Sequence, residues 1–157
     1  EAIQTLRKEV KLYSDELAAR PWVILANKMD EACAAENLEI LRQRFPKSRL
    51  WVLFEPRSNT TIRNLFQTEL AEALAEADYT VISPVENNKR LAPEQRLDQE
   101  KLLADIQAAG TDCYVGKNVD DIVAYVVTHV HPNDVLLVMS NGGFGGIHNK
   151  LLIALAQ

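Results

Sequence analysis

The sequence predicts an α/β protein, a three-layer αβα Rossmann-like sandwich around a mainly parallel five-stranded sheet. Short apolar runs alternate five times with segments whose apolar residues recur every three or four positions. Strands that are apolar at consecutive positions are typical of parallel sheets covered by helices on both faces. The chain has 157 residues, 47% of them hydrophobic, so we expect one domain with its own core over residues 1–157.

The first half of the chain is expected to alternate helices and strands. A helical pattern covers residues 3–17 and stops at Pro21, and a second, short helix over residues 38–45 ends near Pro46. Three apolar runs predict buried strands: "WVILA", "RLWVLF" and "YTVIS". Between the last two strands, one apolar stripe predicts a helix that contains Ile62, Leu65, Phe66, Leu70, Ala73 and Leu74.

The second half begins with the polar stretch "PVENNKRLAPEQR", whose two prolines and lack of periodicity predict an exposed loop. Asp98 and Asn118 are candidate N-caps of the two helices that follow, and Gly110 ends the first of them. "DCYVG" lies between these helices as a short strand. "VLLVM", residues 135–139, is the fifth strand, and the last helix carries Ile147, Leu151 and Leu155 on one face.

Composition excludes several classes of protein. The formal net charge of -5 and the pI near 5.2 argue against a nucleic-acid partner. No apolar run approaches the roughly 20 residues of a membrane-spanning helix, so we expect no membrane partner. Cys33 and Cys113 match no metal-ligand spacing, so we expect no metal site. Two widely separated thiols fit a reducing, cytoplasmic location.

The motif "ANKMD" has the N-K-x-D form, and its surroundings extend the likeness. From "LRKEVKLYSDELAARPWVILANKMD" to "AAENLEILRQRF", about residues 1–46, the chain resembles the Obg family of ribosome-associated GTPases. The resemblance implies that Asn27, Lys28 and Asp30 contact a guanine base. The sequence has no G-x-x-x-x-G-K-[ST] phosphate loop, so we favour a strand end and turn here over GTP binding.

Two longer motifs mark the rest of the chain. "LWVLFEPRSNTTIRNLFQTELAEALAEAD" and "DVLLVMSNGGFGGIHNKLL" resemble the C-terminal domain of the murein peptide ligases, which are Mur ligases. The resemblance covers about residues 47–157 and implies the sheet order 1-5-2-3-4. It also implies a cytoplasmic role in peptidoglycan recycling, with ATP and Mg²⁺ used by the parent ligase and no cofactor bound in this fragment. The implied partner is the murein tripeptide or another small carboxylate or phosphate, bound weakly.

Two polar loops at the carboxyl ends of strands supply the candidate binding residues. In "EPRSNT" these are Arg57, Ser58, Asn59 and Thr60, and a guanidinium can bind a carboxylate or phosphate in bidentate fashion. In "SNGGFGGIH" they are Ser140, Asn141, Gly142, Gly143 and His148, beside a helix expected to begin near Phe144 or Gly145. The alternatives are structural: Asn59 or Thr60 caps a helix, and the glycines only permit a tight turn.

At the start of the domain, this sequence departs from the pattern of the family. Mur C-terminal domains usually begin with a strand ending in D-[DY]-[YF]-A-H-x-P, and here "WVILANKMDEACAAENLEILRQRF" replaces it. The simplest hypothesis is a chimera joined at about residues 45–47, whose function is that of a peptide-binding ligase domain without catalytic activity alone. The alternatives are an Obg-like GTPase fragment with residual guanine binding, and an inactive scaffold.

Overall fold

The computed structural model describes residue 12 and residues 23–26, 40–86 and 88–156. Asn27, Lys28 and Asp30, the expected guanine contacts, lie outside the described residues, and so does Cys33. None of the described helices is both long enough and apolar enough to span a bilayer.

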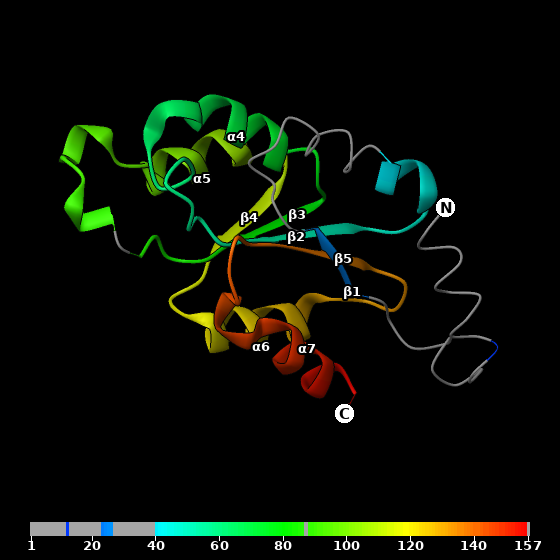
Figure 1. Ribbon diagram of the computed structural model, residues 1–157. Helices are drawn as coiled ribbons and strands as arrows, with labels where there is room; N and C mark the ends of the chain where they lie inside the picture. Colours follow the sequence, from blue (N-terminus) through cyan, green and yellow to red (C-terminus); the bar gives the residue numbers. More distant parts are fainter. Residues whose placement is uncertain (1–11, 13–22, 27–39, 87, 157) are drawn as a thin grey trace.

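A parallel sheet forms the middle of the molecule, which confirms the predicted α/β class (Figure 1). Each strand pairs with its neighbours in parallel, in the order β1-β5-β2-β3-β4. The edge strand β1 is placed by its backbone ladder to β5. The bounds are β1 Val23–Ala26, β2 Leu50–Phe54, β3 Tyr79–Ile82, β4 Asp112–Val115 and β5 Val135–Met139.

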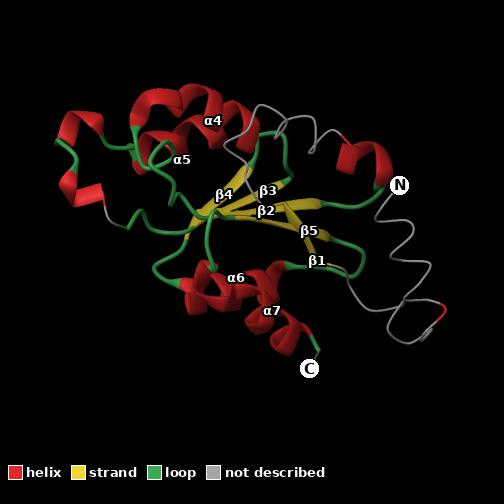
Figure 2. Ribbon diagram, viewed as in Figure 1, coloured by secondary structure: helices red, strands yellow, loops and turns green. Residues whose placement is uncertain are grey.

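Helices cover both faces of this sheet and make three layers (Figure 2). On one face lie α4 (Gln67–Leu74) and α5 (Gln99–Ala108), and on the other α6 (Val119–His129) and α7 (Ile147–Leu155). All five residues of β2 are buried, as are all five of β5. The strands are apolar at consecutive positions because both faces of the sheet lie against helices, as expected.

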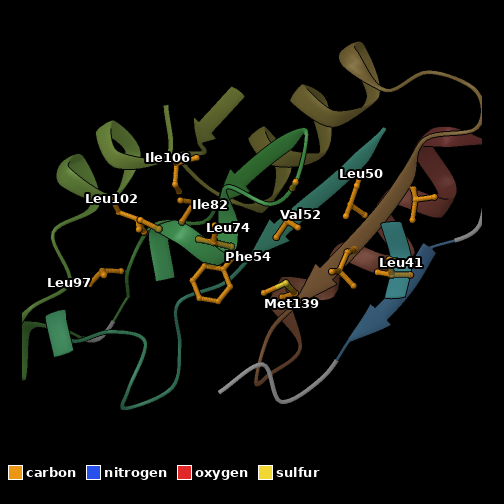
Figure 3. Close-up of a cluster of buried hydrophobic side chains, with 14 residues drawn as sticks. Leu41, Leu50, Val52, Phe54, Leu74, Ile82, Leu97, Leu102, Ile106 and Met139 are labelled. Carbon is orange, nitrogen blue, oxygen red and sulfur yellow. The ribbon is translucent and has the colours of Figure 1, made fainter. Parts of the chain in front are cut away.

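Successive residues of β2 point into two separate cores. Leu50, Val52 and Phe54 enter the core under α4 and α5, shown in Figure 3, whereas Trp51 and Leu53 enter the core over α6 and α7. Met139 at the end of β5 and Leu97 before α5 belong to the first core. The second core is completed by Val81, Ile122, Val126, Leu136, Val138, Phe144, Ile147 and Leu151.

Both predicted N-caps are confirmed. The Asp98 carboxylate accepts a hydrogen bond from the Lys101 backbone N–H at 3.0 Å, and the Asn118 side-chain oxygen accepts one from the Asp121 N–H at 2.9 Å. Each side chain satisfies a first-turn donor that has no partner within its helix. Gly110, which follows α5, has φ +94, a conformation that L side chains rarely adopt.

The prediction for the segment after β2 was wrong, and the exposed loop predicted after β3 is present but more ordered than expected. The helix expected from Ile62 begins at Gln67, after a 3₁₀ turn η1 (Asn64–Phe66), and Leu65 and Phe66 are exposed. The stretch after β3 contains two more 3₁₀ turns, η2 (Asn88–Arg90) and η3 (Pro93–Gln95). The Ile62 carbonyl accepts a hydrogen bond from the Leu97 N–H at 3.0 Å, so the two segments pair with each other.

Asp134, which precedes β5, joins the amino ends of two neighbouring strands. Its side chain is 4% exposed and accepts hydrogen bonds from Arg49 Nε at 2.9 Å, Trp51 Nε1 at 2.9 Å and the His131 N–H at 2.8 Å. Burial alone would raise the pKa of Asp134, but these hydrogen bonds and the Arg49 charge lower it on balance. The ionised carboxylate is therefore the form that stabilises the fold.

We expect Asp134→Asn to lower the free energy of unfolding by about 2–4 kcal/mol at pH 7, because buried donors lose a charged acceptor. The pKa of Asp134 is lower in the folded protein than its unfolded value of about 3.9. The stabilisation that Asp134 gives the fold is therefore complete above the unfolded pKa and is lost as the pH falls through the folded-state pKa. The deficit of the variant should therefore shrink below about pH 5. Urea unfolding followed by tryptophan fluorescence between pH 7 and pH 2.5 measures this difference.

The control is Asp105→Asn, which removes the same charge from the more exposed pair Lys101–Asp105. That pair lies on the surface of α5, so its loss should cost about 0.5 kcal/mol or less. Equal effects of the two substitutions, or a deficit that does not depend on pH, would contradict the role assigned to Asp134.

Candidate functional site

The loops after β2 and β5 lie side by side at the carboxyl edge of the sheet. The two strands pair in parallel with Phe54 opposite Met139, so the residues that follow both strands emerge at the same level. The Glu55 N–H continues the ladder by donating to the Met139 carbonyl at 2.9 Å. The structure therefore brings the "EPRSNT" and "SNGG" segments together.

Arg57 lies directly against Gly142. A Cβ atom added to Gly142 would be 2.9 Å from Arg57 Nε and 3.0 Å from its Cδ and Cζ atoms. The Arg57 side chain is 57% exposed, so the guanidinium keeps access to solvent. Glycine at position 142 is thus required for the close approach of the guanidinium to the opposite loop.

Glu55 connects these loops and is a residue that the sequence prediction missed. Its side chain is 16% exposed, pairs with Arg57 Nη1 at 3.6 Å through Oε1, and accepts a hydrogen bond from the Ser140 hydroxyl through Oε2. The Ser140 oxygen in turn accepts from the Gly142 N–H at 2.9 Å. The signal that could have revealed Glu55 is its place directly after an apolar strand, with a candidate arginine close behind it in the chain.

The other predicted residues of the first loop have different roles. Ser58 and Thr61 bond each other reciprocally, with Thr61 N–H donating to Ser58 Oγ at 3.0 Å and Ser58 N–H donating to Thr61 Oγ1 at 3.0 Å. Asn59 accepts a hydrogen bond from Arg90 Nη2 at 2.9 Å. Neither η1 nor α4 has a side-chain cap, so the capping role considered for Asn59 and Thr60 is wrong.

The glycine-rich loop differs from the expected strand-to-helix turn. The α-helix begins at Ile147, not near Phe144 or Gly145, because residues 144–146 form the 3₁₀ turn η4 (Phe144–Gly146) with φ values of 39, 55 and 72. Phe144 is buried and anchors this turn in the core. Gly145 is required, since a Cβ atom there would lie 2.7 Å from Val119. The first N–H groups of α7 are therefore displaced along the chain from Asn141 and Gly142.

His148 lies in the first turn of α7. Its Nε2 atom is shielded from solvent and has no hydrogen-bond partner within the described residues. Burial lowers the pKa of His148, which favours the neutral imidazole. No hydrogen bond in the described part of the chain joins His148 to Arg57 or Ser140, so the structure does not bring it into the same network.

The arrangement presents hydrogen-bond donors of the kind that anions accept from. The Arg57 guanidinium is its charged donor, and within the described residues the N–H groups of Asn141 and Gly143 have no acceptor. Gly143 faces open space. Across the described ranges, no three His, Cys, Asp or Glu side chains are grouped as a possible metal site.

Comparison with known proteins identifies relatives of this chain. Residues 18–142 match the family model described as Mur ligase, glutamate ligase domain. The match begins well before residue 47, within the segment that resembles Obg. Over 140 residues the chain is 36% identical to the UDP-N-acetylmuramate--L-alanyl-gamma-D-glutamyl-meso-2,6-diaminoheptandioate ligase of Haemophilus influenzae, and the match covers 88% of this chain and 26% of the relative.

A solved structure and a second relative extend this result. The crystal structure of a murein peptide ligase from Psychrobacter arcticus superposes with a TM-score of 0.67 and 27% identity, over 86% of this chain and 28% of that one. GTPase Obg of Akkermansia muciniphila is 57% identical over 47 residues, which is 30% of this chain and 13% of the relative. The chain thus spans about a quarter of the ligases it matches.

We expect Gly142→Ala to displace the Arg57 side chain without unfolding the domain. The new Cβ atom would meet a flexible, exposed side chain, so the free energy of unfolding should change by about 0.5 kcal/mol or less. The Arg57 Nε–Hε signal in a ¹⁵N-edited NMR spectrum should shift. Gly143→Ala is the matched control, because a Cβ atom at that position would have no neighbour within 4 Å, and the signal should stay in place. Equal shifts in both variants would contradict the packing of Arg57 on Gly142.

Proposed function

This chain belongs to the Mur ligase family as its glutamate ligase domain, and we propose that it binds the peptide substrate of a murein tripeptide ligase. The ligase would join L-alanyl-γ-D-glutamyl-meso-diaminopimelate to UDP-N-acetylmuramate, as the name of the Haemophilus influenzae relative states for that protein. Family membership is shown by the match over residues 18–142. The substrate and the place in peptidoglycan recycling are our proposal, because the chain spans 26% of that relative.

The contact between Arg57 and Gly142 is the observation that carries this proposal. It places a guanidinium beside a loop whose Asn141 and Gly143 N–H groups have no acceptor within the described residues. The tripeptide carries free carboxylates on its glutamyl and diaminopimelyl residues. An arginine can bind one of them through two parallel N–H···O hydrogen bonds, which fixes orientation as well as position.

Glu55 determines how strongly such a ligand binds. Its carboxylate is already paired with Arg57, but at 3.6 Å and through one oxygen, which leaves room for a better acceptor. A substrate carboxylate must compete with Glu55, while the hydrogen bond from Ser140 holds Glu55 in place. Because Arg57 is more than half exposed, water and salt weaken the interaction. We therefore expect weak binding by this chain alone.

Formation of the amide bond is assigned to other parts of the parent ligase. ATP with Mg²⁺ would activate the carboxyl group of UDP-N-acetylmuramate there, and this sequence contains no G-x-x-x-x-G-K-[ST] loop to hold the nucleotide. In this chain, Arg57 and the loop at residues 140–143 would hold and orient the peptide. Ser140 and Glu55 would keep that loop in its binding shape.

The likeness to Obg favours a second proposal, about the origin of the first third of the chain. An identity of 57% over 47 residues supports an Obg-derived segment joined to the ligase domain near residues 45–47. Guanine contacts from Asn27, Lys28 and Asp30 alone would give little affinity without a phosphate loop. We propose that this segment has a structural role as part of the sheet and that its residual affinity for guanine nucleotides is negligible.

We expect the tripeptide to perturb the amide NMR signals of Asn141, Gly142 and Gly143 before those of other loops. A dissociation constant of about a millimolar or weaker would agree with an open site. Arg57→Ala should remove most of the response, and Arg57→Lys should restore only part, since lysine keeps the charge without the bidentate fork. Shifts scattered over the surface, or glycine-loop shifts that persist in Arg57→Ala, would contradict peptide binding at this site.

We further expect no ATP or GTP hydrolysis by the purified chain in the presence of Mg²⁺. The reason is the absence from the sequence of a phosphate loop with its lysine and its metal-binding serine or threonine. A phosphate-release assay on the peak fractions of a sizing column tests this directly. Activity that follows the folded protein and disappears in Asp30→Ala would support the GTPase alternative instead.

A further inference from the structure

The segment between β3 and α5 is attached to the loop that carries Arg57. The Leu97 N–H donates to the Ile62 carbonyl at 3.0 Å, and the Asn64 side-chain amide donates to the Glu94 carbonyl at 2.8 Å. Arg63 and Arg96 form an isolated antiparallel bridge between the two segments. In Figure 1 this green segment projects beyond the edge of the sheet. The segment between β3 and α5 is thus held by hydrogen bonds to residues 62–64, which follow the loop of Arg57 in the chain.

The turn η2 is fixed from within this segment. Arg96 Nε donates to the Leu91 carbonyl at 3.0 Å, and Arg96 Nη2 donates to the Lys89 carbonyl at 3.3 Å. Leu91 is 7% exposed, so the residue after the turn is anchored by burial. Arg90 stands between these two tethered positions, and its backbone is therefore held in place before any ligand binds.

Arg90 reaches the loop of Arg57 through Asn59. Its Nη2 atom donates to Asn59 Oδ1 at 2.9 Å, and Asn59 is two residues after Arg57. This places a second guanidinium on the same loop, from a different part of the chain. Both Arg90 and Asn59 are exposed, so the remaining donors of Arg90 can meet a ligand.

The charge of Arg90 is not neutralised by the described part of the protein. Five other basic side chains of the described residues each form an ion pair with a carboxylate: Arg42, Arg49, Arg57, Lys101 and Lys150. No ion pair joins Arg90 to a carboxylate within the described residues, in a protein of net charge -5. A guanidinium held by a neutral amide keeps its full charge for an incoming anion.

We propose that Arg90 is a second carboxylate-binding residue of the site and sets a preference for peptides with more than one free carboxylate. This inference rests on the proposed function, because it takes the tripeptide as the ligand. Arg57 can hold one carboxylate in bidentate fashion, which leaves the others without a charged partner. Arg90, positioned by Asn59 beside the same loop, supplies that partner.

Calorimetric titration of the whole chain tests this with three peptides: the tripeptide, an analogue with 1,5-diaminopentane in place of meso-diaminopimelate, and an analogue with the glutamyl α-carboxylate converted to an amide. The first analogue lacks both diaminopimelyl carboxylates and the second lacks the glutamyl one, so together they cover all the free carboxylates of the tripeptide. Arg90→Gln should weaken binding of the tripeptide about three- to fivefold, the range of an exposed charge pair. For one of the two analogues, Arg90→Gln should have no further effect, because that analogue lacks the carboxylate that Arg90 holds.

Lys117→Gln is the matched control, since it removes one exposed positive charge from the loop after β4 and should leave all three affinities unchanged. Thermal unfolding of Arg90→Gln should match that of the unaltered chain. Arg90→Gln that weakens all three peptides equally, or none, overturns the role of Arg90. If Arg57→Ala abolishes binding while Arg90→Gln has no effect, the proposed function stands and this inference fails. If the unaltered chain binds no peptide, both fail.

Discussion

The buried Asp134 carboxylate is the interaction on which the arrangement of the sheet depends. It accepts hydrogen bonds from Arg49 and Trp51 at the start of β2 and from the backbone after α6, while it stands itself at the start of β5. The register of the two strands, with Leu50 opposite Val135, is thus held at the amino end. Four residues later the same register sets Phe54 opposite Met139. The contacts of Asp134 at the amino edge of the sheet therefore help to position the loops after β2 and β5 at the carboxyl edge.

At the carboxyl edge of the sheet, residues of three kinds shape the candidate site. Glycine at 142 admits the Arg57 side chain, and Glu55 and Ser140 tie the two loops together. Phe144, buried beside left-handed backbone at residues 145 and 146, keeps the loop close to the core. The sheet provides a rigid support, and the exposed Arg57 guanidinium provides a donor that can bind an anion weakly in a fixed orientation. The dipole of α7 contributes less than its sequence position suggests, because that helix starts only at Ile147.

The segment between β3 and α5 adds a part that a simple βαβ crossover does not have. It pairs with the segment after β2 at Ile62, Asn64 and Arg63, and so extends the carboxyl edge outward. The ligand proposed for this chain is a peptide with several carboxylates, as the name of the Haemophilus influenzae relative states for that protein. An edge with one arginine on the first loop and a second on the docked segment suits such a ligand better than a single cation would.

Local patterns in the sequence determined the order of helices and strands and the caps at Asp98 and Asn118, because these follow from residues close together in the chain. The strand order that places the Arg57 loop beside the Gly142 loop was implied only by the resemblance to the Mur ligases. Only the tertiary structure decided the start of α4 and the fold of the segment between β3 and α5, because both depend on hydrogen bonds such as Leu97 to Ile62 across 35 positions. For the same reason Glu55 and Arg90 were missed: their partners, Ser140 and Asn59, come from distant segments and leave no periodic signal.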